Sequence, residues 1–352
     1  MIDVYILGSK NRSSILNNMV SNSTKNLNPI LIDKISELSN LQGKQILFAI
    51  ELNNIGVCYD TLKTIEYLQS LGRESLLNCT GAILIHGPND LYTKNFSREI
   101  IFLANSLGCA FIGHPLVEAT GNLKNFLTWQ KTMDMDLEEI CYTLSEKLVA
   151  RLMSVTEEKI ENPNILALHS SSYETSNTLS LWNLVKKHLP NFTEFHVENG
   201  TILDCSGCSF KTCMHYSEKN SCFYGGVMVE EIYPAIEKAH TILFLCPNYN
   251  DAISANLSAV INRLTALYRK QSFYEKNLFS IVVSGNSGSD ILAKQLIDAL
   301  NINKGFRLPP YFCLMSTANE PRSILKYDNI ETISNDFSNH ILKESKRQIF
   351  HN

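Results

Sequence analysis

The sequence contains ten short apolar runs, most of them separated by polar segments with a helix-compatible pattern. Each run has the length of a β-strand, and strands that alternate with helices build parallel sheets from βαβ units. The chain has 352 residues, which fits two domains better than one. The runs form two sets of five, at residues 3–9, 29–35, 44–52, 81–87 and 109–115 and at residues 164–170, 193–199, 241–246, 278–285 and 311–317.

Between the two sets, the sequence predicts a helix and then a linker. Residues 136–153 carry apolar side chains at helical spacing. Residues 157–164, EEKIENPN, are polar and contain a proline, which is typical of a linker. We therefore expect a first domain over residues 1–158 and a second over residues 159–352. Further helices are expected at residues 97–108 and 334–349.

Composition and charge narrow the classes of function. Hydrophobic residues make up 44% of the chain and charged residues 19%, as in ordinary globular proteins with real cores. A formal net charge of −4 gives no electrostatic reason to expect nucleic acid or an anionic membrane as a partner. The N-terminus lacks a signal-peptide pattern, and no run approaches the roughly 18 apolar residues of a membrane span. We therefore expect a cytoplasmic protein.

A loop rich in hydroxyl groups follows the first predicted strand of the second domain. Open α/β sheets bind ligands at the carboxyl ends of their strands. This loop, HSSSYETSNT at residues 169–178, leads into a helical segment, whose N-terminus favours an anion. A capped surface turn is the alternative. Since the loop lacks a glycine fingerprint and a Walker lysine, it favours a monophosphate. The candidate residues are Ser170, Ser172, Ser176, Asn177 and Thr178.

Two further loops follow the third and fourth predicted strands of this domain. Residues 247–250 supply a stiff turn, an aromatic face and two amides, which suit a planar ring. Residues 284–289 contain glycines that let the backbone approach a ligand closely. Each loop alone reads as an ordinary turn, but together with the first they indicate one ligand site. The candidate residues are Pro247, Asn248, Tyr249, Asn250, Ser284, Gly285, Asn286 and Gly288.

With these loops the second domain resembles the flavodoxin-like NAD(P)H-dependent FMN reductase family, including its iron–sulfur flavoprotein branch. The resemblance implies a three-layer α/β/α domain with a five-stranded parallel sheet, preceded here by a second, degenerate flavodoxin-like α/β domain. It also implies that the first loop binds the FMN phosphate and that the other two contact the ring. The residues that match the family's loops are Ser170, Ser176, Asn177, Thr178, Pro247 and Tyr249.

The sequence departs from the family pattern at two positions. Ser172 stands where the family has an arginine, so the phosphate charge would rest on backbone N–H groups, hydroxyl groups and the helix dipole. Asn262 replaces an aspartate before Arg263, which concerns a helix or subunit contact rather than the flavin site. The resemblance further implies a homodimer or homotetramer.

Four of the ten cysteines lie close together in the second domain, with the spacing C-x2-C-x4-C-x8-C. Without a secretion signal, a disulfide framework is not expected. Four thiolates suffice for a 4Fe-4S cluster or for tetrahedral zinc, and free or redox-active thiols are the third reading. The resemblance to the iron–sulfur branch implies the cluster, although the spacing here is looser. The candidate ligands are Cys205, Cys208, Cys213 and Cys222.

The first domain lacks an equivalent signature. Residues 8–14, GSKNRSS, follow its first predicted strand and could hold a phosphate. His86, Tyr92 and His114 lie near other strand ends. We interpret this domain as a degenerate copy used for packing or assembly.

Taken together, these features predict an FMN-dependent NAD(P)H oxidoreductase that passes electrons to a quinone, azo, flavin or protein acceptor. The cofactor performs the chemical step in such enzymes, so no catalytic acid or base is expected from the protein. One alternative is an iron–sulfur flavoprotein that acts as an electron-transfer protein. The other is a cofactor-free binding protein with a flavodoxin-like fold.

Overall fold

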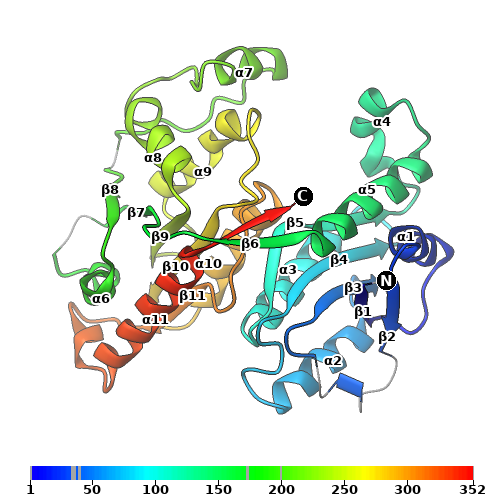
Figure 1. Cartoon of the computed structure of the whole chain (residues 1–352). Helices are drawn as coiled ribbons and strands as arrows, with labels where there is room; N and C mark the ends of the chain where they lie inside the picture. Colours follow the sequence, from blue (N-terminus) through cyan, green and yellow to red (C-terminus); the bar gives the residue numbers. More distant parts are fainter. Residues whose placement is uncertain (1, 33–36, 39–40, 172–173, 199, 352) are drawn as a thin grey trace. The chain divides into compact units, whose positions relative to one another are not determined.

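The computed structural model describes residues 2–32, 37–38, 41–171, 174–198 and 200–351 (Figure 1). The chain divides into two units. The first unit comprises Met1–Thr156, Pro309–Tyr311 and Phe350–Asn352, and the second comprises Glu157–Leu308 and Phe312–Ile349.

A five-stranded parallel sheet forms the centre of the first unit. Its spatial order, β2-β1-β3-β4-β5, is the flavodoxin order. All five apolar runs of the first set form strands. The inner strands β1, β3 and β4 are mostly buried, because helices cover both of their faces, whereas the edge strand β2 is mostly exposed. The strands are β1 (Asp3–Gly8), β2 (Asn28–Leu31), β3 (Gln45–Glu51), β4 (Thr80–Gly87) and β5 (Ala110–Thr120).

The second unit repeats this topology. Its spatial order is β11-β10-β9-β7-β8, which reads 5-4-3-1-2 when the strands are numbered within the unit. The sheet is parallel throughout, and the expected flavodoxin-like α/β fold is confirmed. The strands are β7 (Ile165–His169), β8 (Phe192–His196), β9 (Thr241–Asn248), β10 (Asn277–Ser284) and β11 (Cys313–Thr317).

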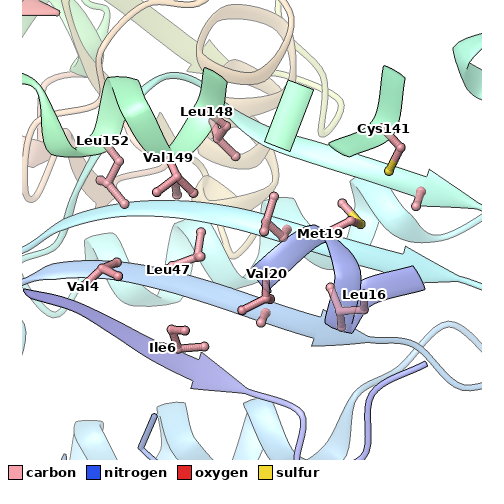
Figure 2. Packing of buried hydrophobic residues seen from close by; sticks show 14 of the residues in the cluster. Val4, Ile6, Leu16, Met19, Val20, Leu47, Cys141, Leu148, Val149 and Leu152 are labelled. Atoms are coloured by element: carbon pink, nitrogen blue, oxygen red, sulfur yellow. The ribbon is translucent and has the colours of Figure 1, made fainter. Parts of the chain in front are cut away.

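Helices cover both faces of the first sheet. On one face, α1 and α5 pack over the strands: Leu16 and Met19 of α1 and Leu148 of α5 share one core cluster with Leu47 of β3, and Figure 2 shows Leu148 above Leu47. Asp136 begins α5 through a capping box with Glu139. The other helices, α2 and α3, contact β1 and the β4–β5 pair. The helices are α1 (Ser14–Thr24), α2 (Tyr59–Ser70), α3 (Thr93–Asn105), α4 (Leu127–Met133) and α5 (Leu137–Met153).

The second sheet is likewise covered by helices. Trp182 of α6 and Ile341 of α11 are fully buried against one face, and α10 contacts β9, β10 and β11. Among the described residues, no helix has the length and apolar character needed to cross a bilayer. The helices are α6 (Asn177–Val185), α7 (Phe210–Ser217), α8 (Tyr233–Lys238), α9 (Ala255–Tyr268), α10 (Ser289–Leu296) and α11 (Ile330–Ser345).

Two expectations about segment ends were wrong. The expected linker at residues 157–164 begins inside a strand, β6 (Val155–Lys159), and the expected last helix ends at Ser345. A further strand, β12 (Arg347–His351), follows and pairs with β6 in a two-stranded sheet. The physical reason is a cross-strand ion pair, in which Arg347 Nε donates to Glu157 Oε2 over 3.0 Å.

Candidate functional site

The three loops expected at the site follow β7, β9 and β10 in the second unit. β7 and β9 are neighbours in the sheet although β8 lies between them in the sequence. The strand order therefore reverses between β7 and β9, which is where open α/β sheets bind ligands. The loops after β7 and β9 leave the sheet on either side of this point.

The first loop ends at a capped helix N-terminus. Ser176 is the N-cap of α6, and its Oγ accepts a hydrogen bond from the N–H of Leu179 over 3.3 Å. The first turn of α6 contains no acidic side chain. Its remaining N–H groups and the Ser176 hydroxyl hydrogen are thus available to an anion. Thr178 lies in the same turn and is buried.

Two serines of the first loop have different surroundings. Ser170 Oγ lies 2.7 Å from the Oγ of Ser254, the residue that begins α9, so the first and second loops are connected. Ser171 is 2% exposed, and its Oγ has no partner in the described part of the chain. A buried hydroxyl without a partner costs about 1–3 kcal/mol, which a phosphate oxygen at this position would offset. Ser172 lies outside the described residues.

The side chain of Asn177 fastens another segment to the site. Its Nδ2 donates to the carbonyl oxygens of Ala318 (3.0 Å) and Glu320 (2.9 Å). Its Oδ1 accepts from the N–H of Ile324 over 3.1 Å. The amide is therefore occupied by the chain, and Asn177 has only its backbone N–H to offer a phosphate.

The segment held by Asn177, residues 318–324, was missed by the sequence analysis. It follows β11, the fifth strand of the sheet. The rule that pointed to the other three loops, that ligands bind at the carboxyl ends of parallel strands, applies to it equally. The position of β11 in the sheet could therefore have identified this segment as part of the site.

Asn248 joins the second loop to the third. Its Nδ2 donates to Ser284 Oγ and to Asp251 Oδ1, each over 3.0 Å, and its Oδ1 accepts from the N–H of Asp251 over 2.8 Å. Ser289 Oγ also donates to Ser284 Oγ, over 2.8 Å. The two loops are therefore held as one piece by Asn248 and Ser284.

A glycine makes the close approach of these loops feasible. Gly288 has φ +96°, and an added Cβ would lie 2.6 Å from Asp251 Oδ1. A larger residue would be strained there and would push the loops apart. The third loop therefore presents backbone where most residues would present a side chain.

The other residues of these loops differ in exposure. Pro247 is buried at the end of β9, whereas Tyr249 is 64% exposed. Asn250 and Asn286 are exposed as well. An exposed aromatic ring and free amides at the mouth of the site can contact a planar ligand and bond its polar edge.

A histidine pair at the ends of β7 and β8 was not expected from the sequence. His169 is buried and stacks on His196, with 4.8 Å between ring centroids. Its Nε2 lies 3.3 Å from Glu194 Oε1. Hydrogen bonds from His169 and then from Lys186 lower the pKa of Glu194 to about 2. Glu194 is therefore a carboxylate, and His169 donates a hydrogen bond to it. His169 is the residue at which β7 ends and the first loop begins.

The cysteine segment does not form the expected metal site. Cys205 is exposed, Cys208 Sγ lies 3.0 Å from Ser206 Oγ, and both Cys213 and Cys222 lie near Tyr233. The described residues include all four cysteines, and no group of three or more His, Cys, Asp or Glu side chains among them could hold a metal ion. Cys213 lies in helix α7, whereas Cys205, Cys208 and Cys222 lie outside it. Neither the cluster nor the zinc reading is supported.

The family comparison concerns the second unit. Residues 163–320 match the family model of the NADPH-dependent FMN reductases. The matched segment contains β7 to β11 and all three loops. No curated protein sequence matches the chain.

Several solved structures are similar to about half of the chain. RosB with a bound 8-demethyl-8-formylriboflavin-5′-phosphate intermediate has 12% identity and a TM-score of 0.38, covering 51% of this chain and 79% of RosB. The NAD(P)H:quinone oxidoreductase of Methanothermobacter marburgensis has 10% identity and a TM-score of 0.36, covering 50% and 94%. The apo NADH:FMN oxidoreductase EMOB has 16% identity and a TM-score of 0.35, covering 53% and 94%.

Proposed function

We propose that this chain is a flavin-dependent NAD(P)H oxidoreductase, because its residues 163–320 match the NADPH-dependent FMN reductase family and carry a site that fits FMN. The observation that carries the proposal is the connection of three loops at one edge of the sheet. The side chains of Ser170 and Ser254 are hydrogen-bonded, and so are those of Asn248 and Ser284. These contacts preorganise a phosphate position and a ring position before any ligand arrives.

The first loop would hold the phosphate. The N–H groups of the first turn of α6, with the hydroxyls of Ser171 and Ser176, supply donors without a fixed positive charge. The helix dipole adds about half a positive charge at the same place. Ser170 and Thr178 support this loop, and Asn177 fixes its end through its side chain.

The second and third loops would hold the ring. Tyr249 offers its exposed aromatic face, and Asn250 and Asn286 offer amides at the polar edge. The backbone from Gly285 to Gly288 can approach closely. Bound FMN supplies the redox chemistry, while the protein supplies position and polarity.

We propose that electrons pass to a quinone, azo, flavin or protein acceptor. The proposal includes a cytoplasmic location and a homodimer or homotetramer. Light scattering of the purified protein tests the oligomeric state.

The test is an anaerobic reaction of the FMN-loaded protein with NADH and with NADPH. At least one nicotinamide should bleach the visible flavin absorption, and oxygen or a quinone should restore it. Tyr249→Ala should slow the bleaching or lower the FMN content. Trp129→Ala is the matched control, because Trp129 is 50% exposed but belongs to the first unit.

Two results would replace the proposal. If dithionite reduces the bound flavin but neither nicotinamide does, the chain is an electron-transfer flavoprotein. If purified protein neither contains FMN nor binds it in a titration, the chain is a binding protein with a flavodoxin-like fold.

A further inference from the structure

The first unit carries a cluster of polar side chains at the carboxyl edge of its own sheet. β1 and β3 are neighbours although β2 lies between them in the sequence, so the strand order reverses there as it does in the second unit. Ser9 follows β1, Glu51 ends β3, and His86 lies near the end of β4. Glu51 and His86 are direct partners in the register of the two strands. The cluster thus lies where this topology binds ligands.

Glu51 accepts hydrogen bonds from both His86 and Ser13. His86 Nδ1 lies 2.5 Å from Glu51 Oε1. Ser13 donates to Glu51 Oε2 twice, from its backbone N–H (3.0 Å) and from its Oγ (2.9 Å). The N–H of Glu51 in turn donates to Ser9 Oγ over 2.7 Å. Glu51 is therefore fixed from both sides.

These contacts fix the charge of Glu51. Burial raises the pKa of Glu51, but the hydrogen bonds from His86 and Ser13 outweigh burial, and the pKa is lowered overall. Glu51 is therefore a carboxylate, which places the Nδ1 hydrogen of His86 on the side facing it. In the neutral ring, Nε2 then carries a lone pair and accepts hydrogen bonds.

Nε2 of His86 is open to a ligand. It makes no hydrogen bond within the described part of the chain. It is also not one of the fully buried side-chain nitrogen and oxygen atoms, so it keeps some solvent exposure. The side chain as a whole is 12% exposed. A histidine oriented by a carboxylate and open at its other nitrogen is the usual arrangement of a protein base.

Glu51 also excludes phosphorylated ligands from this edge. Ser13 is the N-cap of α1, so it occupies the position in this unit that Ser176 occupies in the second. Its N–H is already bonded to Glu51, and a phosphate placed there would meet the carboxylate. At close range two negative charges repel each other by several kcal/mol in a site of reduced polarity. An anionic ligand is therefore disfavoured beside Glu51.

The loops that follow β3 and β4 carry exposed apolar and aromatic side chains, next to exposed polar ones at Asn53 and Asn89. Ile55 and Tyr59 are 66% and 58% exposed, and Leu91 and Tyr92 are 60% and 43% exposed. The loops that carry them touch, because Gly56, with φ +79°, leaves room for the Tyr92 ring, which a Cβ there would meet at 2.3 Å. A small set of apolar side chains around one polar group is the common composition of a small-molecule site.

We propose that the first unit binds an uncharged aromatic hydroxyl compound, whose O–H donates to Nε2 of His86 while its ring lies against the apolar and aromatic side chains of these loops. This site lies in a different unit from the proposed FMN site and involves none of its residues. The compound class is set by three features, namely a base that accepts one hydrogen bond, a carboxylate that repels anions, and exposed aromatic side chains.

The test uses the whole chain and three matched probes, namely phenol, anisole and phenyl phosphate. Each is titrated while the ring signals of the histidines are followed by NMR, with and without FMN. Phenol, uncharged at neutral pH because its pKa is about 10, should shift the His86 signals whether or not FMN is bound. Anisole, which lacks the hydroxyl hydrogen, should bind about tenfold more weakly. Phenyl phosphate should not shift the His86 signals.

Two variants sharpen this result. His86→Phe keeps an aromatic ring without a base and should weaken phenol binding about tenfold. His215→Phe replaces an exposed histidine of the second unit and should leave phenol binding unchanged. Equal binding of phenol and anisole, binding of phenyl phosphate at His86, or phenol shifts that vanish when FMN is added would each overturn the proposal. The titration of the unaltered chain decides the matter even if His86→Phe does not fold.

Discussion

The two units share a strand order but differ at the ends of corresponding strands. In the second unit the last paired residues of the third and fourth strands are Asn248 and Ser284. In the first unit the corresponding pair is Glu51 and His86. One pair is neutral and ties two loops together, whereas the other is an ionised acid with a base. The topology determines where a ligand binds, and these few residues determine which ligand it is.

The same contrast holds at the helix that follows the first strand of each unit. Both α1 and α6 begin with a serine whose Oγ accepts from the chain. At α1 the N-cap N–H is bonded to Glu51, whereas the first turn of α6 carries no acidic residue. One helix N-terminus is therefore already neutralised, and the other still favours an anion.

The largest expected effect concerns a buried ion pair in the second unit. Arg307 Nη1 lies 3.1 Å from Glu344 Oε2, and the two side chains are 7% and 2% exposed. Glu344→Gln leaves the Arg307 charge buried without its partner and should lower the free energy of unfolding by about 3–5 kcal/mol. Trp182 reports on this unit and Trp129 on the first, so single-tryptophan versions of the chain distinguish them.

The matched change in the first unit is Leu148→Ala. Leu148 is 1% exposed in the core between α5 and the sheet. The cavity should cost about 2–5 kcal/mol and should shift the denaturation midpoint reported by Trp129. We expect each variant to shift the denaturation midpoint of its own unit more than the midpoint of the other unit. If both signals move together in both variants, the units unfold as one, and the comparison does not extend to stability.

The next effect tests the neutral strand ends of the second unit. Asn248→Asp introduces a carboxylate at the position that corresponds to Glu51. It removes the amide donor to Ser284 and places two carboxylates at the 3.0 Å contact with Asp251. FMN affinity should fall about tenfold to a hundredfold, measured by titration of the apo-protein. Asn191→Asp is the control, since it adds the same charge at an exposed position of the same unit outside the three loops. Equal losses in both variants would assign the effect to charge alone.

The smallest effect is the pH dependence of the second unit. The pKa of Glu194 is lowered from 4.5 to about 2. A lowered pKa stabilises the fold above the unfolded-state value, and this contribution is lost as the pH falls from 4.5 toward 2. Since Glu194 is partly exposed, the loss should be about 1 kcal/mol. Urea midpoints followed through Trp182 measure it, and Glu194→Gln should flatten that part of the profile. An unchanged slope would show that the pair with His169 contributes nothing to stability.

Much of the fold could be predicted because it depends on local pattern. Apolar runs of strand length, separated by helical segments, specify parallel strands, and the loops after β7, β9 and β10 follow from that pattern. The strand at residues 155–159 could not be predicted, because its burial pattern is mostly exposed and it pairs with a strand far along the chain. No local pattern records such a partner.

The candidate site could be predicted only as far as its loops. The pairs His169–Glu194 and Glu51–His86 join neighbouring strands, so their contact depends on strand order and register. Glu51 and His86 are 35 positions apart, and neither stands in a recognisable motif. The four cysteines show the opposite error. Closeness in sequence suggested one shared site, but among the described residues the four thiols form no group that could hold a metal ion.

The pairing of β6 with β12 has a consequence for how the chain is made. Glu157 and Arg347 are 190 positions apart, so the ribosome must add every element of the second unit before the two strands can meet. The five strands of the first unit, by contrast, are all contained in the first 120 residues. Domains generally fold as units during synthesis, the N-terminal one first. The first unit can therefore acquire its sheet while the rest is still being translated, whereas β6 stays unpaired until residues 347–351 have been synthesised.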